Sequence, residues 1–339
     1  MLLWTLIPVG SLAIIAAVAL GAAWTIGQAH DHDARVPVRS YLEALRVGNV
    51  DDALQQSGYT AKPADVLLDF NAYDAAKNTL THYAISSPHR TGSTATVVAQ
   101  LTFGSKKTTQ TFHLRTTGSD FVFFPRWKLV PFSPGEVTVQ LNGPKDASIY
   151  ADGSQDITAR GLVHLRALPG TYSIGLSGTD PVYAADLLTG QYYPGMKAPK
   201  TPKLTVWLTD KASATALSAV NSWLASCLTS GMSKPTGCAY GQQDLHPSGG
   251  TLTNQTWTLD KAPTFEIGPW DGTGFPVVTT SPGSVAFRST ITLPDGRSGT
   301  YGSISDGVVV LAGHITRIDA GSATYQELDL TGSGSTPQT

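Results

Sequence analysis

The chain has 339 residues, of which 41% are hydrophobic and 14% are charged, and its formal net charge is −2. This apolar fraction is enough for packed cores and excludes a chain that is disordered throughout. Proteins that bind nucleic acid normally carry a basic stripe, whereas the longest basic run here is Lys106–Lys107. We therefore expect no nucleic-acid partner. The 34 glycines and 21 prolines suit short strands joined by turns.

The first feature along the chain is an apolar segment, residues 2–29, which contains no charged side chain. It exceeds the roughly 20 residues that span a bilayer as a helix. Trp4 and Trp24 lie near its ends, as aromatic residues do at membrane interfaces. We predict a transmembrane anchor over residues 1–29. The alternative is a signal peptide cleaved near Ala29, but the apolar run is about twice the usual length and no basic residue precedes it.

Two features disagree about the side of the membrane on which the rest of the chain lies. Arg35 and Arg39 follow the anchor, and by the positive-inside rule they favour the cytoplasm. The two cysteines and the low charge content favour the outside. We expect a single-pass protein of the cell membrane with an extracytoplasmic body, and the membrane as one partner. Cleavage of the anchor would instead give a secreted protein.

Helical periodicity follows the apolar segment. Within 36–49, apolar residues recur at i, i+3, i+4 and i+7, which predicts an amphipathic helix. Gly48–Asn49 can end this helix, and two acidic residues in a first turn favour a second short helix over 50–58. We expect a third short helix within 64–78.

From residue 95 the period becomes that of a strand. Apolar and polar side chains alternate over 95–103, and Gly104–Ser105 suits a type II′ hairpin turn. Partner strands are expected over 106–114 and within 121–132. Helices followed by an antiparallel sheet predict an α+β domain in which the helices cover one face of the sheet. In this order of elements, residues 30–134 resemble the nuclear-transport-factor-like, or cystatin-like, cone domains.

The resemblance implies that a pocket can lie between the helices and the curved sheet. Enzymes among the cone domains place an Asp general base and a Tyr donor inside that pocket. None of the matching residue types here belongs to a family motif, so we expect no catalytic residue and no enzyme activity. The residue types present are Asp65, Asp69, Asp74, Tyr41, Tyr73 and Tyr83.

Residues 135–208 predict a small β-sandwich with a connector before its last strand. Apolar residues alternate over 137–141. The segments ASIYADG (147–153) and PGTYSIG (169–175) resemble the PEGA-like surface modules. The G-x-T-P that usually lies between such segments is replaced here by DITARGL, so the resemblance is incomplete.

Residues 209–330 repeat the order of a helix followed by strands. Leu217, Val220, Leu224 and Leu228 share one helical face within 213–228. We predict a second, shortened α+β cone-like domain and a flexible tail over 331–339. The predicted fold class of the whole chain is therefore α+β: a transmembrane helix, a cone domain, a small β-sandwich and a shortened cone. The expected strands of the last domain lie around 254–267, 284–293, 300–319 and 323–328.

Cys227 and Cys238 are the only cysteines. Zinc sites usually need four ligands, with two to four residues between paired cysteines, and a redox pair needs two residues between them. Ten residues intervene here, which fits neither. We predict a disulfide, which would stabilise the fold by about 3 kcal/mol, with two free thiols as the alternative. A disulfide also indicates an oxidising compartment.

Two further groups were weighed as sites. The run 30–33, His-Asp-His-Asp, has side chains that can chelate a divalent cation, but a solvated spacer is the simpler interpretation, and we predict no metal and no cofactor. Trp270 and Phe275, in the glycine-rich stretch 268–276, are candidate ligand or interaction residues. Their simpler interpretation is that of core aromatics.

These observations predict a non-enzymatic membrane protein with a binding or assembly role at the bacterial cell envelope. Its partner would be an envelope protein or a cell-wall component. Domain order and composition resemble those of membrane-anchored envelope proteins of high-GC Gram-positive, actinobacterial-type bacteria. Two alternatives stay open: a small-ligand-binding or isomerase- or hydrolase-like cone domain, and a sensor or regulator of envelope stress.

Overall fold

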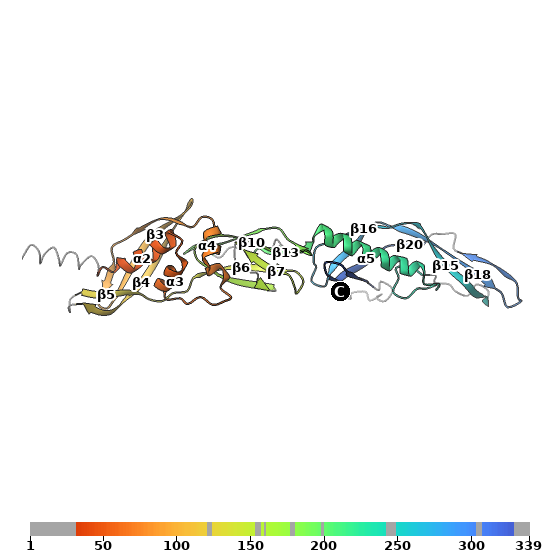
Figure 1. Ribbon diagram of the computed structural model, residues 1–339, viewed down its shortest axis with the longest axis horizontal. Helices are drawn as coiled ribbons and strands as arrows, with labels where there is room; N and C mark the ends of the chain where they lie inside the picture. Colours follow the sequence, from red (N-terminus) through yellow and green to blue (C-terminus); the bar gives the residue numbers. More distant parts are fainter. Residues whose placement is uncertain are drawn as a thin grey trace, which may run out of the picture.

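The computed structural model describes residues 32–120, 124–152, 157–158, 161–176, 180–197, 200–241, 249–302 and 307–328. The predicted anchor (1–29) and tail (331–339) lie outside these ranges. No helix within them combines the length and the apolar character that a bilayer span requires. The molecule is elongated, with three bodies following one another along its long axis (Figure 1). We refer to them as the first body (32–134), the β module (135–208) and the C-terminal body (209–328).

The expected α+β class is wrong. Of the described residues, 49% are in strands and 18% in helices, so the chain is mostly β. Some strands and strand ends escaped prediction because they lack apolar alternation. In 89–91, and in 251–253 and 298–299, which extend two expected strands, most side chains are exposed and several are Thr, Ser or Gly. Threonine favours strands without contributing to a hydrophobic pattern, so the sequence pattern of such segments does not distinguish them from loops.

The helices of the first body follow the predicted pattern. Local capping defines α3, because the Asn49 side chain accepts a hydrogen bond from the Asp52 N–H and Gly58 adopts a left-handed conformation after the last turn. The third predicted helix is split into a short 3₁₀ turn, η1, and a helix, α4. The bounds are α2 (Arg35–Arg46), α3 (Val50–Ser57), η1 (Val66–Leu68) and α4 (Phe70–Ala75).

The sheet of the first body is antiparallel, in the order β1-β3-β4-β5, with β2 also paired to β3. The predicted hairpin is confirmed: β3 and β4 pair from Phe103–Lys106 outward, and Gly104 has a φ of 57°. Strand β1 was not predicted. The bounds are β1 (Leu80–Ile85), β2 (His89–Thr91), β3 (Thr94–Phe103), β4 (Lys106–Asp120) and β5 (Phe124–Leu129).

The space between the helices and the sheet of the first body is filled by side chains. Tyr41 of α2, Phe112 of β4 and Phe132 meet edge to face, with ring centroids 5.2 to 6.0 Å apart. Aliphatic residues of α2, β3 and β4 are buried around them. The packed aromatic cluster occupies the position in which a cone pocket would lie.

The β module contains three small sheets. Their orders are β12-β10-β7-β8, β13-β6-β9 and β11-β14. The first two pack closely, because Gly190 of β12 lies against Val137 of β6, where a Cβ would come within 2.4 Å of the valine side chain. The bounds are β6 (Gly135–Asn142), β7 (Ser148–Ala151), β8 (Ile157–Thr158), β9 (Gly161–Ala167), β10 (Gly170–Leu176), β11 (Tyr183–Ala184), β12 (Leu188–Tyr192), β13 (Lys203–Thr205) and β14 (Trp207–Leu208).

The first body and the β module are joined by backbone and aromatic contacts. Lys77 and Thr171 exchange two backbone hydrogen bonds, each 2.8 Å long. The ring of Tyr193 packs against Phe103, with centroids 5.1 Å apart, and the Lys106 ammonium lies 4.6 Å from the centre of the same ring. The tip of the β3–β4 hairpin is thereby fixed to the β module.

In its described residues, the C-terminal body has one helix, α5 (Asp210–Leu228), and two four-stranded sheets instead of the expected single set of four strands. One sheet has the order β15-β18-β19, with β20 paired to β18, and the other has the order β16-β17-β21-β22. Helix α5 packs on the second sheet through Trp223 and Tyr325, whose ring centroids are 5.0 Å apart. The bounds are β15 (Thr251–Lys261), β16 (Thr264–Ile267), β17 (Phe275–Ser281), β18 (Gly283–Thr292), β19 (Ser298–Gly302), β20 (Gly307–Val309), β21 (Ala312–Ile318) and β22 (Ala323–Glu327).

Cys227 and Cys238 form a disulfide, as predicted. The bond ties the last turn of α5 to the loop that follows it. The same loop is attached to the first sheet of this body, because the indole N–H of Trp257 donates to the Met232 carbonyl over 2.8 Å and Tyr240 packs on the same indole. The disulfide indicates an oxidising, extracytoplasmic location.

Replacing both cysteines with alanine should lower the free energy of unfolding by about 3 kcal/mol, because the unfolded chain regains the freedom of the closed loop. Chemical denaturation of the wild-type protein and of the Cys227→Ala, Cys238→Ala variant would measure the difference. A reductant should bring the wild-type protein to the level of the variant and leave the variant unchanged. Equal stability of the oxidised wild-type protein and the variant would contradict this prediction.

Candidate functional site

The joint between the β module and the C-terminal body contains a hollow of about 700 Å³. Side chains from both bodies line it, so its shape depends on how the two are joined. From the β module the lining residues are 143–146, Gly161 and Tyr183, and from the C-terminal body they are Trp270, Gly272, Thr273, Phe275 and 315–318.

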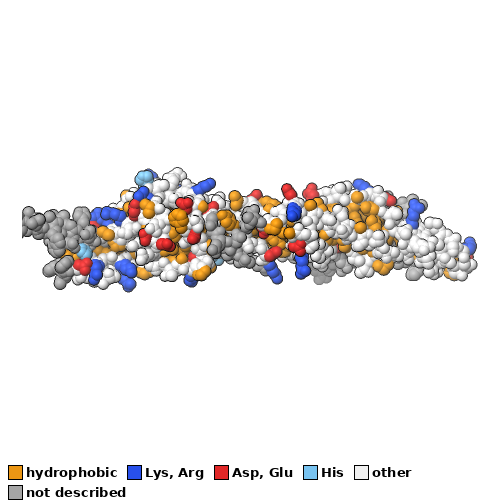
Figure 2. All heavy atoms as spheres, viewed as in Figure 1, with side chains coloured by type: hydrophobic (Ala, Val, Ile, Leu, Met, Phe, Trp, Pro, Cys, Tyr) orange, Lys and Arg blue, Asp and Glu red, His pale blue; other side chains and the backbone are white. Residues whose placement is uncertain are grey.

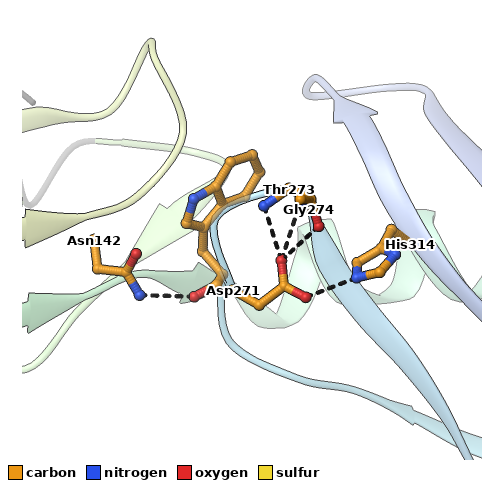
Figure 3. Close-up of polar contacts among 6 residues, drawn as sticks. Asn142, Asp271, Thr273, Gly274 and His314 are labelled. Atoms are coloured by element: carbon orange, nitrogen blue, oxygen red, sulfur yellow. Dashed lines mark hydrogen bonds and ion pairs between the residues drawn. The ribbon is translucent and has the colours of Figure 1, made fainter. Parts of the chain in front are cut away.

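Two residues of the C-terminal body bond to the β module at the joint. Thr209 donates from its N–H to the Val182 carbonyl over 2.9 Å and from its hydroxyl to the Pro181 carbonyl over 3.0 Å. The Trp270 N–H donates to the Val206 carbonyl over 2.8 Å. The Trp270 carbonyl accepts from the side-chain amide of Asn142 over 2.9 Å (Figure 3). Asn142 ends β6, and Val206 lies between β13 and β14. Trp270 is therefore bonded to two neighbouring segments of the β module.

The loop that presents Trp270 is shaped by Asp271. One carboxylate oxygen accepts from the Thr273 N–H over 2.9 Å, from the Thr273 hydroxyl over 2.8 Å and from the Gly274 N–H over 3.1 Å. The other oxygen lies 2.7 Å from Nε2 of His314, on β21 (Figure 3). Gly272, at a φ of 113°, allows the turn, since side-chain-bearing residues rarely adopt this conformation. The loop is thus tied both to itself and to the sheet behind it.

These contacts keep Asp271 ionised. Burial alone would raise the pKa of this carboxyl, but the Thr273 N–H, the His314 ring, the Thr273 hydroxyl and the Gly274 N–H outweigh burial and hold the pKa well below its usual range. The negative charge is therefore permanent at neutral pH.

Three aromatic rings meet beside the hollow, and Trp270 is the most exposed of them. Tyr183 stacks on Phe275, with centroids 6.0 Å apart, and Trp270 meets Phe275 edge to face at 5.3 Å. The Tyr183 hydroxyl donates toward both carboxylate oxygens of Asp146, at 3.0 and 3.1 Å. Burial, followed by this hydrogen bond, raises the pKa of Tyr183. The phenol stays a neutral donor, and the aromatic wall is fixed in place.

The rim of the hollow is charged and exposed. Lys145 and Asp146 project from the β module, and Thr316 and Arg317 from β21. An aromatic wall with ammonium, guanidinium, carboxylate and hydroxyl groups around it suits a polar ligand that stacks one face on a ring and hydrogen-bonds at its edges.

The polar groups of the loop are not arranged for nucleophilic catalysis. The Thr273 hydroxyl donates to Asp271 and not to His314, so a nucleophile bonded to a base, as covalent catalysis requires, is not formed by these three residues. Within the described ranges, no group of three or more His, Cys, Asp or Glu side chains is arranged to hold a metal ion.

The two aromatic residues singled out from the sequence come together at this joint. Phe275 is only 1% exposed and packs as a core residue, whereas Trp270 is half-buried and lines the hollow. Sequence reasoning missed Asp271, although Asp-Gly-Thr-Gly is a composition typical of a side-chain-capped turn. It also missed His314 and Asn142, which lie far away along the chain.

The acidic residues considered for a cone pocket have local structural roles. Asp65 accepts from the Tyr59 hydroxyl and from the Lys62 N–H, and Asp69 caps α4 by accepting from the Asn71 N–H. Asp74 is exposed. The tyrosines are also engaged: Tyr41 lies in the aromatic cluster, Tyr73 donates to the Leu45 carbonyl and Tyr83 donates to Glu43.

Only the second half of the run 30–33 lies in the described residues. Asp33 is paired with Arg35, with a nitrogen–oxygen distance of 2.6 Å, and lies 3.6 Å from Arg90. The carboxylate is therefore used in ion pairs.

Comparison with family models, with curated proteins and with solved structures finds no match to this chain.

Replacing Asp271 with alanine should loosen the joint, because the turn that presents the Trp270 backbone loses its acceptor. We expect a loss of about 1 kcal/mol at neutral pH, a low value for a charge-assisted set of bonds because the carboxylate is 40% exposed. The pKa of Asp271 is lowered on folding, so its contribution is complete above the unfolded-state pKa of about 3.9. It is lost as the pH falls through the folded-state value.

Unfolding free energies of wild-type and Asp271→Ala protein at several pH values would test whether the stabilisation by Asp271 is lost as the pH falls. Hydrogen exchange at the Trp270 amide would test whether the loss of stability lies at the joint, and this exchange should be faster in the variant. Asp295→Ala is a control, since Asp295 also accepts a hydrogen bond from the backbone N–H two residues further on, but it lies in the turn between β18 and β19, which does not line the hollow. Equal exchange at Trp270 in wild-type and Asp271→Ala protein would show that Asp271 does not support the joint.

Proposed function

We propose that this protein is a non-enzymatic binding protein of the bacterial cell envelope and that its ligand occupies the hollow at the joint. The ligand is an envelope protein or a cell-wall component. The observation that carries the proposal is the hollow itself, in which two bodies supply an aromatic wall and a charged rim. Binding at such a place would also fix the angle between the β module and the C-terminal body.

Location supports the proposal. The disulfide indicates an oxidising compartment, and the uncharged segment 2–29 has the length and composition of a membrane anchor. With the anchor retained, an elongated body would hold the joint at a distance from the membrane. The resemblance to membrane-anchored envelope proteins of actinobacterial type belongs to the same proposal.

An enzymatic or ligand-binding role for the first body has less support. Such a role needs an open pocket between helices and sheet, with acidic and hydroxyl groups that converge in it. Tyr41, Phe112 and Phe132 fill that space. Asp65 and Asp69 serve a turn and a helix cap, and Asp74 is exposed. The hollow at the joint is the better place for a ligand.

Trp270 is the residue on which binding should depend most. Its backbone holds the joint, but its indole lines the hollow. Alanine at this position keeps both backbone hydrogen bonds and removes only the ring. Truncation of a central aromatic residue of a binding site commonly costs about 2 kcal/mol or more, which is roughly a 30-fold loss of affinity.

The test is site-specific photocrosslinking of the full chain in intact cells. A photoreactive amino acid at Thr316, an exposed position on the rim, should capture the ligand, and capture should fall about 30-fold in the Trp270→Ala background. The same probe at Ser218, on the exposed face of α5, is the matched control and should capture little.

Thermal unfolding of the Trp270→Ala protein would show that the fold is kept. Capture at Thr316 that is indifferent to Trp270, or capture at Ser218 with none at Thr316, would move the binding site away from the hollow and overturn the proposal.

A further inference from the structure

Basic side chains gather at the end of the first body where the described chain begins. Five basic side chains and two carboxylates, those of Asp33 and Asp120, lie at this end, which gives a surplus of three positive charges. The whole chain has a net charge of −2, so the remainder carries −5. Figure 2 shows Lys and Arg side chains at this end of the elongated molecule. The five are Arg35, Arg90, Arg115, Arg126 and Lys128.

Contacts place these residues at one end. Arg90, on β2, lies 3.6 Å from Asp33, just before α2. Asp120, at the end of β4, lies 3.4 Å from Arg126 and 3.7 Å from His32. A hollow of about 330 Å³ between the start of α2 and strands β4 and β5 is lined by several of the same side chains, including Trp127 and Lys128. Arg115 is the register partner of Lys128 on the exposed face of the sheet.

The chain that precedes this end is short. Two residues separate the predicted anchor, which ends at residue 29, from residue 32, where the described structure begins. Three extended steps of at most about 3.6 Å each reach about 10 Å. The Debye length at 0.1 M salt is also about 10 Å. With the predicted anchor ending at residue 29, residue 32 would lie within the layer in which an anionic membrane surface still attracts positive charge.

The start of the first body is also rigid. Arg35 contacts Asp33 through its backbone N–H and its guanidinium, at 2.6 to 2.9 Å. The guanidinium and the N–H of Arg35, against the opposing effect of burial, lower the pKa of Asp33. The charged pair fixes residue 33 to the first turn of α2, so the first body is ordered from its first described residues.

We propose that this basic end docks on the anionic phospholipid headgroups of the membrane that holds the anchor. Docking would hold the long axis of the protein away from the membrane surface. It also accounts for Arg35 following an anchor whose body lies outside the cytoplasm, since this arginine is used in the folded end. The proposal rests on the predicted anchor and is independent of what occupies the hollow at the joint.

The test is hydrogen exchange of the full chain in lipid nanodiscs, one set of phosphatidylglycerol and one of phosphatidylcholine. Each basic residue near an anionic surface favours docking about fivefold, so three surplus charges shift the docked-to-undocked ratio by on the order of 100-fold. Backbone amides of 89–94 and 115–120 should exchange more slowly in phosphatidylglycerol discs, by up to that factor. High salt should abolish the difference.

The variant Arg115→Gln, Lys128→Gln removes two charges that have no carboxylate partner within 4 Å in the described structure, so the fold should be kept. The docked-to-undocked ratio should fall by about 25-fold. Lys200→Gln, Lys203→Gln removes the same charge from exposed positions in the β module and should change nothing. Far-ultraviolet circular dichroism of both variants would confirm folding.

Equal exchange in the two kinds of disc, or protection that survives Arg115→Gln, Lys128→Gln, would overturn the proposal. So would protection that soluble poly(glycerol phosphate) produces equally in phosphatidylcholine discs, because the ligand would then be an anionic polymer and not the lipid surface. None of these results bears on crosslinking at the joint.

Discussion

The position of the C-terminal body depends on the backbone of Trp270. Its N–H and its carbonyl are each bonded to the β module, 2.8 and 2.9 Å from Val206 and Asn142. A single residue that offers both a donor and an acceptor fixes translation and rotation together, and the Tyr183–Phe275 stack closes the remaining side. Asp271 supports this arrangement from within the loop by collecting three donors. Thr209 adds two further hydrogen bonds between the bodies, to the Val182 and Pro181 carbonyls.

Much of the local structure could be predicted from the sequence. The amphipathic spacing over 36–49 corresponds to α2, the alternation over 95–103 to β3, and the ten-residue gap between the cysteines to a disulfide. Each of these depends on residues close together in the chain, where periodicity and turn chemistry act directly. The helix within 213–228 is likewise confirmed, although its most deeply buried residues include Ala216 and Cys227 as well as the predicted Val220 and Leu224.

The fold class and most of the site could not be predicted, and the reasons are physical. Strand β2 and the first residues of β15 and β19 are stabilised by pairing with neighbouring strands and expose most of their side chains, so no apolar period marks them. The joint brings together residue 142 and residue 270, which are 128 positions apart. Asp271 and His314, which also meet in the fold, are 43 positions apart. The aromatic residues of the hollow can be picked out in the sequence. Their roles depend on the fold, which buries the Phe275 side chain in the core and leaves the Trp270 side chain lining the hollow.

The parallel pairing of β13 with β6 has a consequence for how the protein is made. β6 begins at residue 135 and β13 ends at residue 205, so segments from near the two ends of the β module are neighbours in one sheet. Loop closure over this length must precede the contacts that compensate for it. During synthesis the first body can therefore be complete while the edge of β6 that pairs with β13 is still open. A chain that ends before residue 203 lacks this pairing altogether.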